Sequence, residues 1–279
     1  MFEPTFTTQH GVLFEEDALN ILPSLQSGVM DCIFADPPFN LGKNYRNGFQ
    51  DNLDTSSYFT WCAEWLQEGA RVLKPGGAFF VYATPELAIR FAEILRTTLN
   101  FRHWIAVTMK GTFRRGKKLY PAHYALLYYT KGEPRVFNAL RVPIPTCRHC
   151  GREIKDYGGH RDKLNPAGLN LADFWDDTSP NRHKKFKVRP GVNELKLVIP
   201  ERAILMATNI GDLVLDPFGG GGSTFQAAEM HQRHWIGIER YDGRHIRDRM
   251  QAQFPLSSHQ SPQFDFAPLF REPISPVNY

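Results

Sequence analysis

The sequence predicts an α/β fold in which a mixed, doubly wound sheet is covered by helices on both faces. Short apolar runs alternate along the chain with segments of helical period, and two of these runs end in loops rich in proline or glycine. With 42% apolar residues, the 279-residue chain is long enough for one large α/β domain and a smaller insertion.

The first half of the chain predicts strands and helices in alternation. Segments of helical period run through 19–25, 55–73 and 85–95. We expect Thr55 or Ser56 to cap the second of these helices and Pro75-Gly76-Gly77 to stop it. Buried strands are expected at 12–14, 30–35, 78–83 and 101–109, with an antiparallel partner at 123–130.

The first motif lies at a strand end. The apolar run 30–35 is followed by Asp36, Pro37, Pro38 and Phe39. Two consecutive prolines remove two backbone donors and fix both φ angles near about −65°, so the carbonyls there can accept hydrogen bonds from a ligand. A carboxylate, these carbonyls and an aromatic face together suit a flat ring that bears an amino group. An ordinary strand stop with an Asp turn is the alternative interpretation.

The second motif begins at Asp216, 180 residues beyond Asp36. An apolar strand at 213–215 leads into four glycines and a helical run, and glycines let a backbone approach a ligand and present N–H groups at a helix N-terminus. A strand at 235–238 then ends in an acid, at about the spacing at which a carboxylate meets ribose hydroxyls. A flexible turn is the alternative. The expected cofactor-binding residues are Asp216, Pro217, Phe218, Gly219, Gly220, Gly221, Ser223, Thr224 and Glu239.

The order of these motifs indicates a family. Asp-Pro-Pro-Phe-Asn at 36–40, followed by Leu-Val-Leu-Asp-Pro-Phe and four glycines at 213–222, resembles the β-class DNA amino-methyltransferases. That family modifies adenine N6 or cytosine N4 with S-adenosylmethionine. The resemblance implies a circularly permuted Rossmann-like methyltransferase fold with a seven-stranded mixed sheet and a target-recognition insertion. The seven strands counted along this chain agree with it.

The resemblance also implies roles for single residues. Asp36 and the Pro37 carbonyl would accept the amino protons of a flipped base, Phe39 would stack on the ring, and Asp36 would also lie against the cofactor. Asp17 and Ala18 match the position that contacts the cofactor's adenine, although Asp17 also suits a helix N-cap. Asp before Pro-Pro is commoner in the adenine enzymes and Ser in the cytosine enzymes. N6-methyladenine is therefore the expected product, with N4-methylcytosine as the alternative.

Positive charge is concentrated in one third of the chain. Residues 110–190 contain 18 Lys and Arg against 7 Asp and Glu, a balance of +11, whereas the remainder holds 15 basic and 22 acidic residues, a balance of −7. A basic segment in an acidic body is typical of an insertion that binds a polyanion, and a solvated surface is the alternative. The expected contacts to double-stranded DNA are Arg114, Arg115, Lys117, Lys118, Arg182, Lys184, Lys185 and Lys187.

The same insertion holds a pair of cysteines. Cys147 and Cys150 in Thr-Cys-Arg-His-Cys-Gly have the spacing of half a structural zinc site, which His160 or His183 could complete. A reduced pair of thiols in a turn is the alternative. Asn193-Glu194-Leu195-Lys196 stands where the family carries a His-Pro-Thr-Gln-Lys-Pro-like segment, which leaves the contacts to the cofactor's methionine open.

We therefore expect four regions. They are a catalytic half at 1–134, a basic target-recognition insertion at 135–190, a cofactor-binding half at 191–254 and a proline-rich tail at 255–279 that is extended or docks on the domain or on a second copy. Without a long apolar run or a leader, the protein is expected in a bacterial or archaeal cytoplasm, at the nucleoid through DNA. A homodimer and a cognate restriction endonuclease are further candidate partners. RNA as substrate, a nicotinamide-dependent enzyme and a non-catalytic DNA-binding protein remain alternatives.

Overall fold

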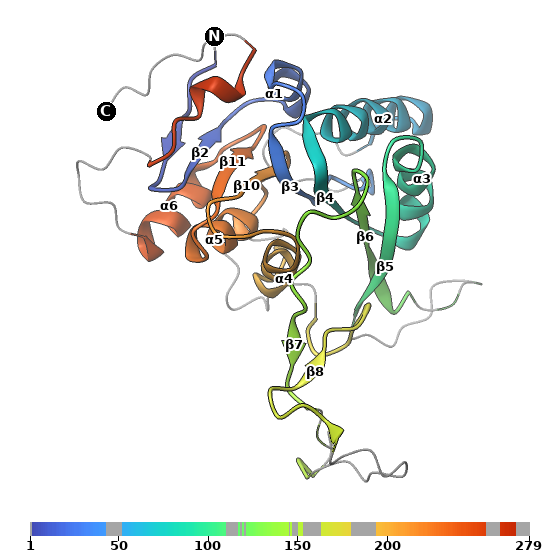
Figure 1. Ribbon diagram of the computed structural model, residues 1–279. Coiled ribbons are helices and arrows are strands. Elements are labelled where there is room, and N and C mark those ends of the chain that lie inside the picture. The colour runs from blue at the N-terminus through green and yellow to red at the C-terminus, as the bar shows by residue number, and fades with distance from the viewer. Residues whose placement is uncertain are drawn as a thin grey trace.

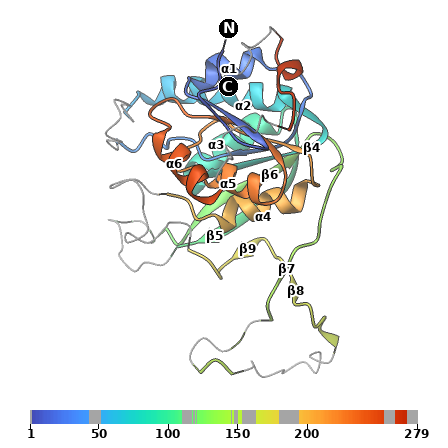
Figure 2. The same ribbon diagram turned by 90° about the vertical axis from the view of Figure 1, so that its left-hand side faces the viewer.

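The computed structural model describes residues 2–42, 52–109, 117, 119, 121–144, 146, 150–152, 163–179, 194–254 and 263–271. One large mixed sheet forms the centre of the molecule, with helices on both of its faces (Figure 1). A two-stranded arm projects away from this body in both views (Figure 2).

The sheet has nine strands in the order β1-β2-β11-β10-β3-β4-β6-β5-β9. The strands β2, β11, β10, β3 and β4 are parallel neighbours, whereas β6 is antiparallel to both β4 and β5. All seven expected strands are present, and the two-residue strands β1 and β9 extend the sheet at its edges. The bounds are β1 (Phe6–Thr7), β2 (Gly11–Phe14), β3 (Met30–Ala35), β4 (Leu73–Ala83), β5 (Asn100–Thr108), β6 (His123–Thr130), β9 (Phe174–Trp175), β10 (Leu213–Asp216) and β11 (His234–Ile238).

Two hydrophobic clusters fill the space between the sheet and the helices. Side chains alternate between the two faces of a strand, so Ile33 and Ala35 join the cluster under α1, α2 and α3, while Cys32 and Phe34 join the one under α4, α5 and α6. This sandwich of helix, sheet and helix confirms the expected fold class. The helices are α1 (Ala18–Ser24), α2 (Thr55–Val72), α3 (Pro85–Leu95), α4 (Val198–Ala207), α5 (Ser223–Met230) and α6 (Arg244–Gln253).

The boundaries of α2 differ from the expectation. Its N-cap is Asp54, whose Oδ1 accepts a hydrogen bond of 3.0 Å from the Ser57 amide, so the prediction of Thr55 or Ser56 was wrong. The helix ends at Val72, where Lys131 Nζ donates to the carbonyls of Ala70 (2.9 Å) and Leu73 (2.8 Å). Pro75-Gly76-Gly77 therefore does not stop a helix.

Those three residues lie inside β4. The strand begins opposite Met30 of β3 and shifts its register before Cys32 pairs with Ala78. Gly76 absorbs this irregularity with a φ of +78°, and its amide donates to the Lys131 carbonyl at 2.6 Å. Pairing across the sheet has thus overridden a local pattern that favours a loop.

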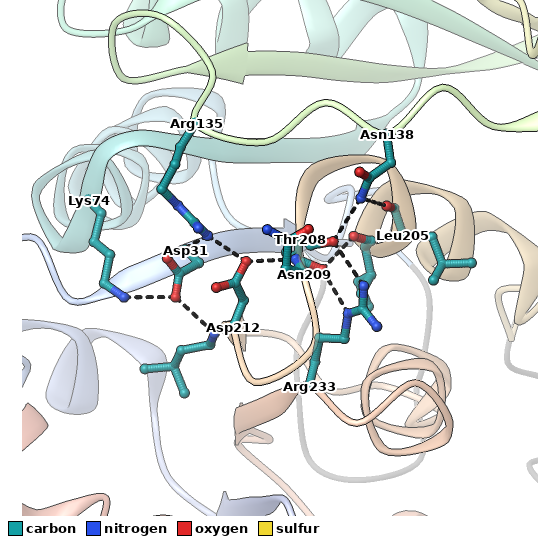
Figure 3. Close-up of polar contacts among 11 residues, drawn as sticks. Asp31, Lys74, Arg135, Asn138, Leu205, Thr208, Asn209, Asp212 and Arg233 are labelled. Carbon is teal, nitrogen blue, oxygen red and sulfur yellow. Dashed lines mark hydrogen bonds and ion pairs between the residues drawn. The ribbon is translucent and has the colours of Figure 1, made fainter.

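A polar network holds the amino-terminal edge of the sheet (Figure 3). Asp31 is buried at the start of β3 and accepts hydrogen bonds from Lys74 Nζ (2.8 Å), Arg135 Nη2 (3.0 Å) and the Leu213 amide (2.9 Å). Arg135 also pairs with Asp212. Because Arg135 lies just after β6, these bonds fix the point at which the chain leaves the sheet for the insertion.

A second anchor follows three residues later. Asn138 Nδ2 donates to the carbonyls of Leu205 (2.9 Å) and Thr208 (3.0 Å) at the end of α4 (Figure 3). Arg233 supports the same turn, with Nη2 at 2.8 Å from the Thr208 carbonyl. The chain then runs into the arm, an antiparallel pair of β7 (Arg141–Val142) and β8 (Leu169–Asn170).

The insertion returns to the body at β9. Trp175 is buried there, and the Arg202 guanidinium of α4 lies over its ring at 5.2 Å while Arg202 Nη1 donates to Asp177 Oδ1 at 2.9 Å. Asn138, near the start of the insertion, and Asp177, further along it, are thus both attached to α4. Of the tail, residues 263–271 dock beside α1, where the Arg271 amide donates to the Ser24 carbonyl at 2.7 Å. In the described residues, no helix is long and apolar enough to cross a membrane.

Candidate functional site

The two sequence motifs leave the sheet side by side. β3 and β10 are parallel neighbours, with Val214 opposite Cys32 and Leu215 opposite Ile33. Asp36 follows the last residue of β3 and Asp216 is the last residue of β10, so both carboxylates lie at the carboxyl edge of the sheet. α2, which follows β3, and α5, which follows β10, pack on opposite faces of the sheet. Ligands of open α/β sheets bind at the carboxyl edge where neighbouring strands lead to opposite faces.

The proline loop is held in place from α2. The Tyr58 hydroxyl donates a hydrogen bond of 2.7 Å to the Pro38 carbonyl. Asn40, in the left-handed region with a φ of +54°, exchanges two hydrogen bonds with the backbone of Leu53, at 2.8 and 2.9 Å. Pro37 is buried, whereas Asp36 is only half-buried. The loop is therefore rigid around a carboxylate that solvent still reaches.

An aromatic cluster lies beside this carboxylate. The Phe39 ring is 6.4 Å from Tyr82 and 6.1 Å from Tyr124, and the two tyrosine rings are 5.0 Å apart. Burial raises the pKa of Tyr82 far above its ordinary value, and the charges of Asp36 and Tyr124 raise it further. Tyr82 is therefore a protonated phenol beside Asp36 at any physiological pH.

The glycine loop is folded tightly against the neighbouring strand. The Gly219 amide donates to the Ile238 carbonyl at 2.7 Å, and a Cβ on Gly219 would lie 2.9 Å from the Phe225 ring. Gly220 and Gly222 have φ angles of +50° and +74°, which favour glycine. Gly222 then precedes the first turn of α5, where Ser223 and Thr224 are buried.

Glu239 binds this loop directly. Its Oε2 accepts a hydrogen bond of 2.7 Å from the Gly220 amide, and the ring Nε2 of His245 lies 2.6 Å from the Gly220 carbonyl. Both backbone polar groups of Gly220, the amide and the carbonyl, are therefore hydrogen-bonded to side chains. The second acid expected from the spacing and the glycine loop form one unit.

The pKa of the Asp216 carboxyl is shifted upward. The carboxyl is buried, and burial raises its pKa to about 7, although hydrogen bonds from Thr224 and the Phe218 amide (2.9 Å) oppose the shift. Phe218, the next but one residue, packs on α2 at 5.0 Å from Trp65 and 5.6 Å from Trp61. The glycine loop is thus attached to the same helix as the proline loop.

The candidates for contact with the cofactor's adenine, Asp17 and Ala18, follow β2, which is the neighbour of β11 in the sheet. Asp17 caps α1, because its side chain accepts a hydrogen bond of 3.0 Å from the Leu19 amide. Its Oδ2 also lies 3.2 Å from Arg240 Nε. The structure thus places Asp17 as an N-cap close to the residue after Glu239, and Ala18 is buried beside it. Their contact with the cofactor stays a prediction.

Sequence reasoning missed one buried ion pair at the site. Arg249 of α6 and Glu194 lie 2.9 Å apart, and both side chains are buried. A Cβ on Gly221 would be 3.4 Å from Glu194 Cγ, so the pair covers the glycine loop. Glu194 belongs to the segment that departs from the family pattern, which was the only signal. Sequence reasoning also placed Tyr58, Tyr82 and Tyr124 in expected helices and strands without a role at the site. Their closeness to Asp36 arises only from the fold.

Most of the expected DNA contacts lie outside the described residues. Among them only Lys117 is described, and it is exposed. Cys147 also lies outside that part of the chain, whereas Cys150 is an exposed free thiol. No group of three or more His, Cys, Asp and Glu that could hold a metal occurs within the described ranges. The zinc site stays a prediction.

Comparisons with known proteins agree with this arrangement. A DNA methylase family model, N6_N4_Mtase, matches residues 30–246. The type II methyltransferase M.BamHI of Bacillus amyloliquefaciens is 47% identical over 249 residues, which are 89% of this chain. The chain spans 59% of the length of that relative. The DNA adenine methyltransferase YhdJ of Escherichia coli K12 is 27% identical over 85% of this chain and 81% of its own length.

Solved structures show the same fold. A DNA modification methylase of Thermus thermophilus, complexed with S-adenosyl-L-methionine, matches 87% of this chain and 94% of its own with a TM-score of 0.59 and 19% identity. The cytosine-N4-specific PvuII DNA methyltransferase matches 94% of this chain and 92% of its own with a TM-score of 0.60 and 19% identity. The family match and the placement of both motifs on neighbouring strands lead to one conclusion: the chain belongs to the N6/N4 DNA methylase family.

Proposed function

We propose that the protein transfers a methyl group from S-adenosylmethionine to the N6 amino group of adenine in duplex DNA. The observation that carries the proposal is the adjacency of the proline loop and the glycine loop on parallel strands β3 and β10. The 47% identity to the type II methyltransferase M.BamHI and the DNA methylase family match support methyl transfer to DNA. The 27% identity to the DNA adenine methyltransferase YhdJ supports adenine as the base.

The residues at the carboxyl edge fit the cofactor. Four consecutive glycines leave the loop without side chains, and Glu239 offers a carboxylate to a ribose diol at the end of the adjacent strand. S-adenosylmethionine, when bound, supplies an activated methyl group. Glu239 and the glycine loop would hold its nucleoside, with Asp17 and Ala18 toward the adenine and Asp216, Pro217, Phe218, Ser223 and Thr224 shaping the loop.

The catalytic task of the proline loop follows from the chemistry of an aromatic amine. The lone pair of the amino nitrogen is delocalised into the ring and is a weak nucleophile. Asp36 and the Pro37 carbonyl would accept the two amino protons, which localises the lone pair and stabilises the positive charge that develops on nitrogen. The Pro38 carbonyl is already bonded to Tyr58, so Pro37 has this role. Positioning contributes up to about 7–11 kcal/mol and dominates.

The target base has to leave the duplex to reach this edge. Extruding it costs a few kcal/mol, roughly, and stacking on Phe39 would offset part of that cost. We assign DNA contact and target choice to the basic insertion at 135–190, whose arm projects from the body and which is attached to α4 through Asn138 and Asp177. The region also carries the proposed zinc pair. We also propose that the catalytic and cofactor-binding halves are in circularly permuted order. The further candidates are a homodimer, a cognate restriction endonuclease as partner, and association with the nucleoid through DNA.

N4-cytosine transfer is the second candidate, because the matched family covers both N6 and N4 chemistry. One experiment separates the alternatives. The protein is incubated with tritiated S-adenosylmethionine and duplex DNA, and the digested nucleosides are analysed. We expect label in N6-methyladenine. Label in N4-methylcytosine alone reassigns the base, transfer only to RNA reassigns the substrate, and no transfer to any nucleic acid refutes the enzyme.

A further inference from the structure

Tyr82 lies at the catalytic edge although no motif contains it. Ala35 of β3 pairs with Val81 of β4, so the residues that follow them, Asp36 and Tyr82, come next to each other at the ends of adjacent parallel strands. Tyr82 packs in the same cluster as Phe34 and Cys32, and residues two apart on a strand share a face. Asp36 therefore continues the face to which Tyr82 belongs.

The Tyr82 hydroxyl is buried and has no hydrogen-bond partner within the described part of the chain. The side chain is 3% exposed, and the aromatic rings of Phe39 and Tyr124 lie against it. A buried hydroxyl without a partner costs stability, and a phenylalanine would fill the same space without that cost. Because this hydroxyl also lies beside Asp36, it indicates a ligand at that position that supplies the missing acceptor.

The chemistry of the edge identifies the acceptor. Asp36 presents carboxylate oxygens, which accept, beside a phenol that stays protonated, so the pair offers one acceptor and one donor next to each other. The Watson–Crick edge of adenine offers the complement, an N6 amino donor beside the N1 acceptor. Cytosine has the same order at N4 and N3. Guanine and thymine have a carbonyl beside an N–H and present the reverse order.

We propose that Tyr82 is a substrate-binding residue whose Oη–H donates a hydrogen bond to the ring nitrogen beside the amino-bearing carbon of the flipped base. In adenine this atom is N1. The inference rests on the proposed function and deepens it, because Tyr82 would select amino-bearing bases while Asp36 accepts the amino proton. A site built to hydrogen-bond a substrate rejects analogues that lack the matching atom.

The test removes the hydroxyl and the ring nitrogen separately and together. The recognition site is first mapped from DNA methylated by the wild type. Then kcat/KM is measured for wild type and Tyr82→Phe on duplexes with adenine or 1-deazaadenine at the target position. We expect Tyr82→Phe to lose about tenfold to a hundredfold on adenine. On 1-deazaadenine the two proteins should have equal kcat/KM, because the analogue has no N1 for the hydroxyl to bond. Effects of the analogue on base pairing act on both proteins and cancel in this cycle.

Tyr128→Phe is the matched control. Tyr128 is also buried without a hydroxyl partner among the described residues, in the same cluster, but it stacks on Phe80 at 4.6 Å, further from the end of β4. This variant should keep wild-type kcat/KM and the full sensitivity to 1-deazaadenine. Tyr82→Phe should melt no lower than wild type, which separates its loss of activity from unfolding.

The outcomes distinguish the two proposals. Two outcomes would show that Tyr82 does not bind the ring nitrogen of adenine. In the first, the wild type methylates adenine and Tyr82→Phe has the same kcat/KM. In the second, replacing adenine by 1-deazaadenine lowers kcat/KM by the same factor in both proteins. If the wild type transfers methyl only to cytosine, the same cycle is carried out with cytosine and 3-deazacytosine. Equal kcat/KM values for the two proteins on 3-deazacytosine again support the contact. If the wild type methylates no duplex, the proposed function is refuted and this inference with it.

Discussion

The Tyr58 hydroxyl donates a 2.7 Å hydrogen bond to the Pro38 carbonyl, and this bond links α2 to the proline loop. The Tyr58 ring lies 5.8 Å from Trp61, which in turn lies 5.6 Å from Phe218 of the glycine loop. One helix therefore contacts both the proline loop and the glycine loop, which the proposed reaction has to bring together. A rigid support of this kind is what a reaction dominated by positioning needs.

Removing that hydroxyl tests the support. Tyr58→Phe should lower kcat about tenfold, since a small displacement of the loop is costly, while destabilising the fold by only about 1 kcal/mol. Single-turnover kinetics and thermal melting measure the two effects. Tyr129→Phe is the control, because its hydroxyl bonds a helix carbonyl of Ala92 at 3.4 Å. Equal kcat in the two variants would show that the Pro38 bond is only structural.

Asp36→Ala should abolish methyl transfer and leave cofactor binding nearly intact. The change removes the acceptor that we propose stabilises the developing charge, an effect worth at least about 10²–10³-fold in kcat. Calorimetry with S-adenosylhomocysteine and the tritium assay measure the two properties. Asp173→Ala, at an exposed carboxylate, should change neither. Near wild-type turnover in Asp36→Ala would remove this carboxylate from the mechanism.

The fold followed from sequence where local pattern and tertiary pairing agree. The strands that end at Asp36 and Asp216 are short apolar runs with clear stops, and both lie where the sequence predicts them. The start of β4 was mistaken because Pro75-Gly76-Gly77 locally favours a loop, whereas pairing with β3 extends the strand through it.

The site was only partly predictable for a similar reason. Its motif residues are recognisable in sequence, but Tyr82 becomes its neighbour only through the register of β3 and β4. The pairing of Glu194 with Arg249 joins residues 55 apart, and no local spacing signals it. Long-range contacts of this kind follow from the fold and not from composition or periodicity.

Gly220→Val should weaken cofactor binding strongly. Gly220 has a φ of +50°, which a β-branched residue strains, and its peptide is bonded to both Glu239 and His245. Gly28→Val is a matched control, because Gly28 has a φ of +68° with nothing within 4 Å of the new Cβ. Both variants should lose similar stability, but only Gly220→Val should lose affinity in calorimetry. Unchanged affinity would move the cofactor away from this loop.

Asp216→Asn should stabilise the ligand-free protein at pH 8. Burial raises the pKa of Asp216 to about 7 in the folded state, against about 3.8 when unfolded, so the folded state binds the proton more tightly. The stability that this proton provides is complete below the unfolded pKa and is lost as the pH rises through about 7. Ionised Asp216 thus destabilises the wild type at pH 8, and the amide variant avoids this cost.

The gain should be on the order of 2–4 kcal/mol at pH 8 and should shrink as the pH falls toward 5. Denaturant unfolding of both proteins across that range measures it. Asp31→Asn provides a contrast, since its buried carboxylate is paired with Lys74 and Arg135 and the change should destabilise at both pH values. A difference between wild type and Asp216→Asn that does not vary with pH would refute the elevated pKa.

Residues 110–190 should carry most of the DNA affinity, because the rest of the chain has a balance of −7 and repels a polyanion. Neutralising Lys184, Lys185 and Lys187 together should weaken binding to all sequences. The slope of log affinity against log salt should flatten by up to about 0.9 for each phosphate that the variant no longer neutralises, with cofactor affinity unchanged. Arg90→Ala with Arg96→Ala, on α3 of the body and at its C-cap, is the control and should leave the slope unaltered. If the triple variant keeps the parent's slope, the phosphate contacts lie elsewhere, with Arg114, Arg115, Lys117 and Lys118 the next group to neutralise.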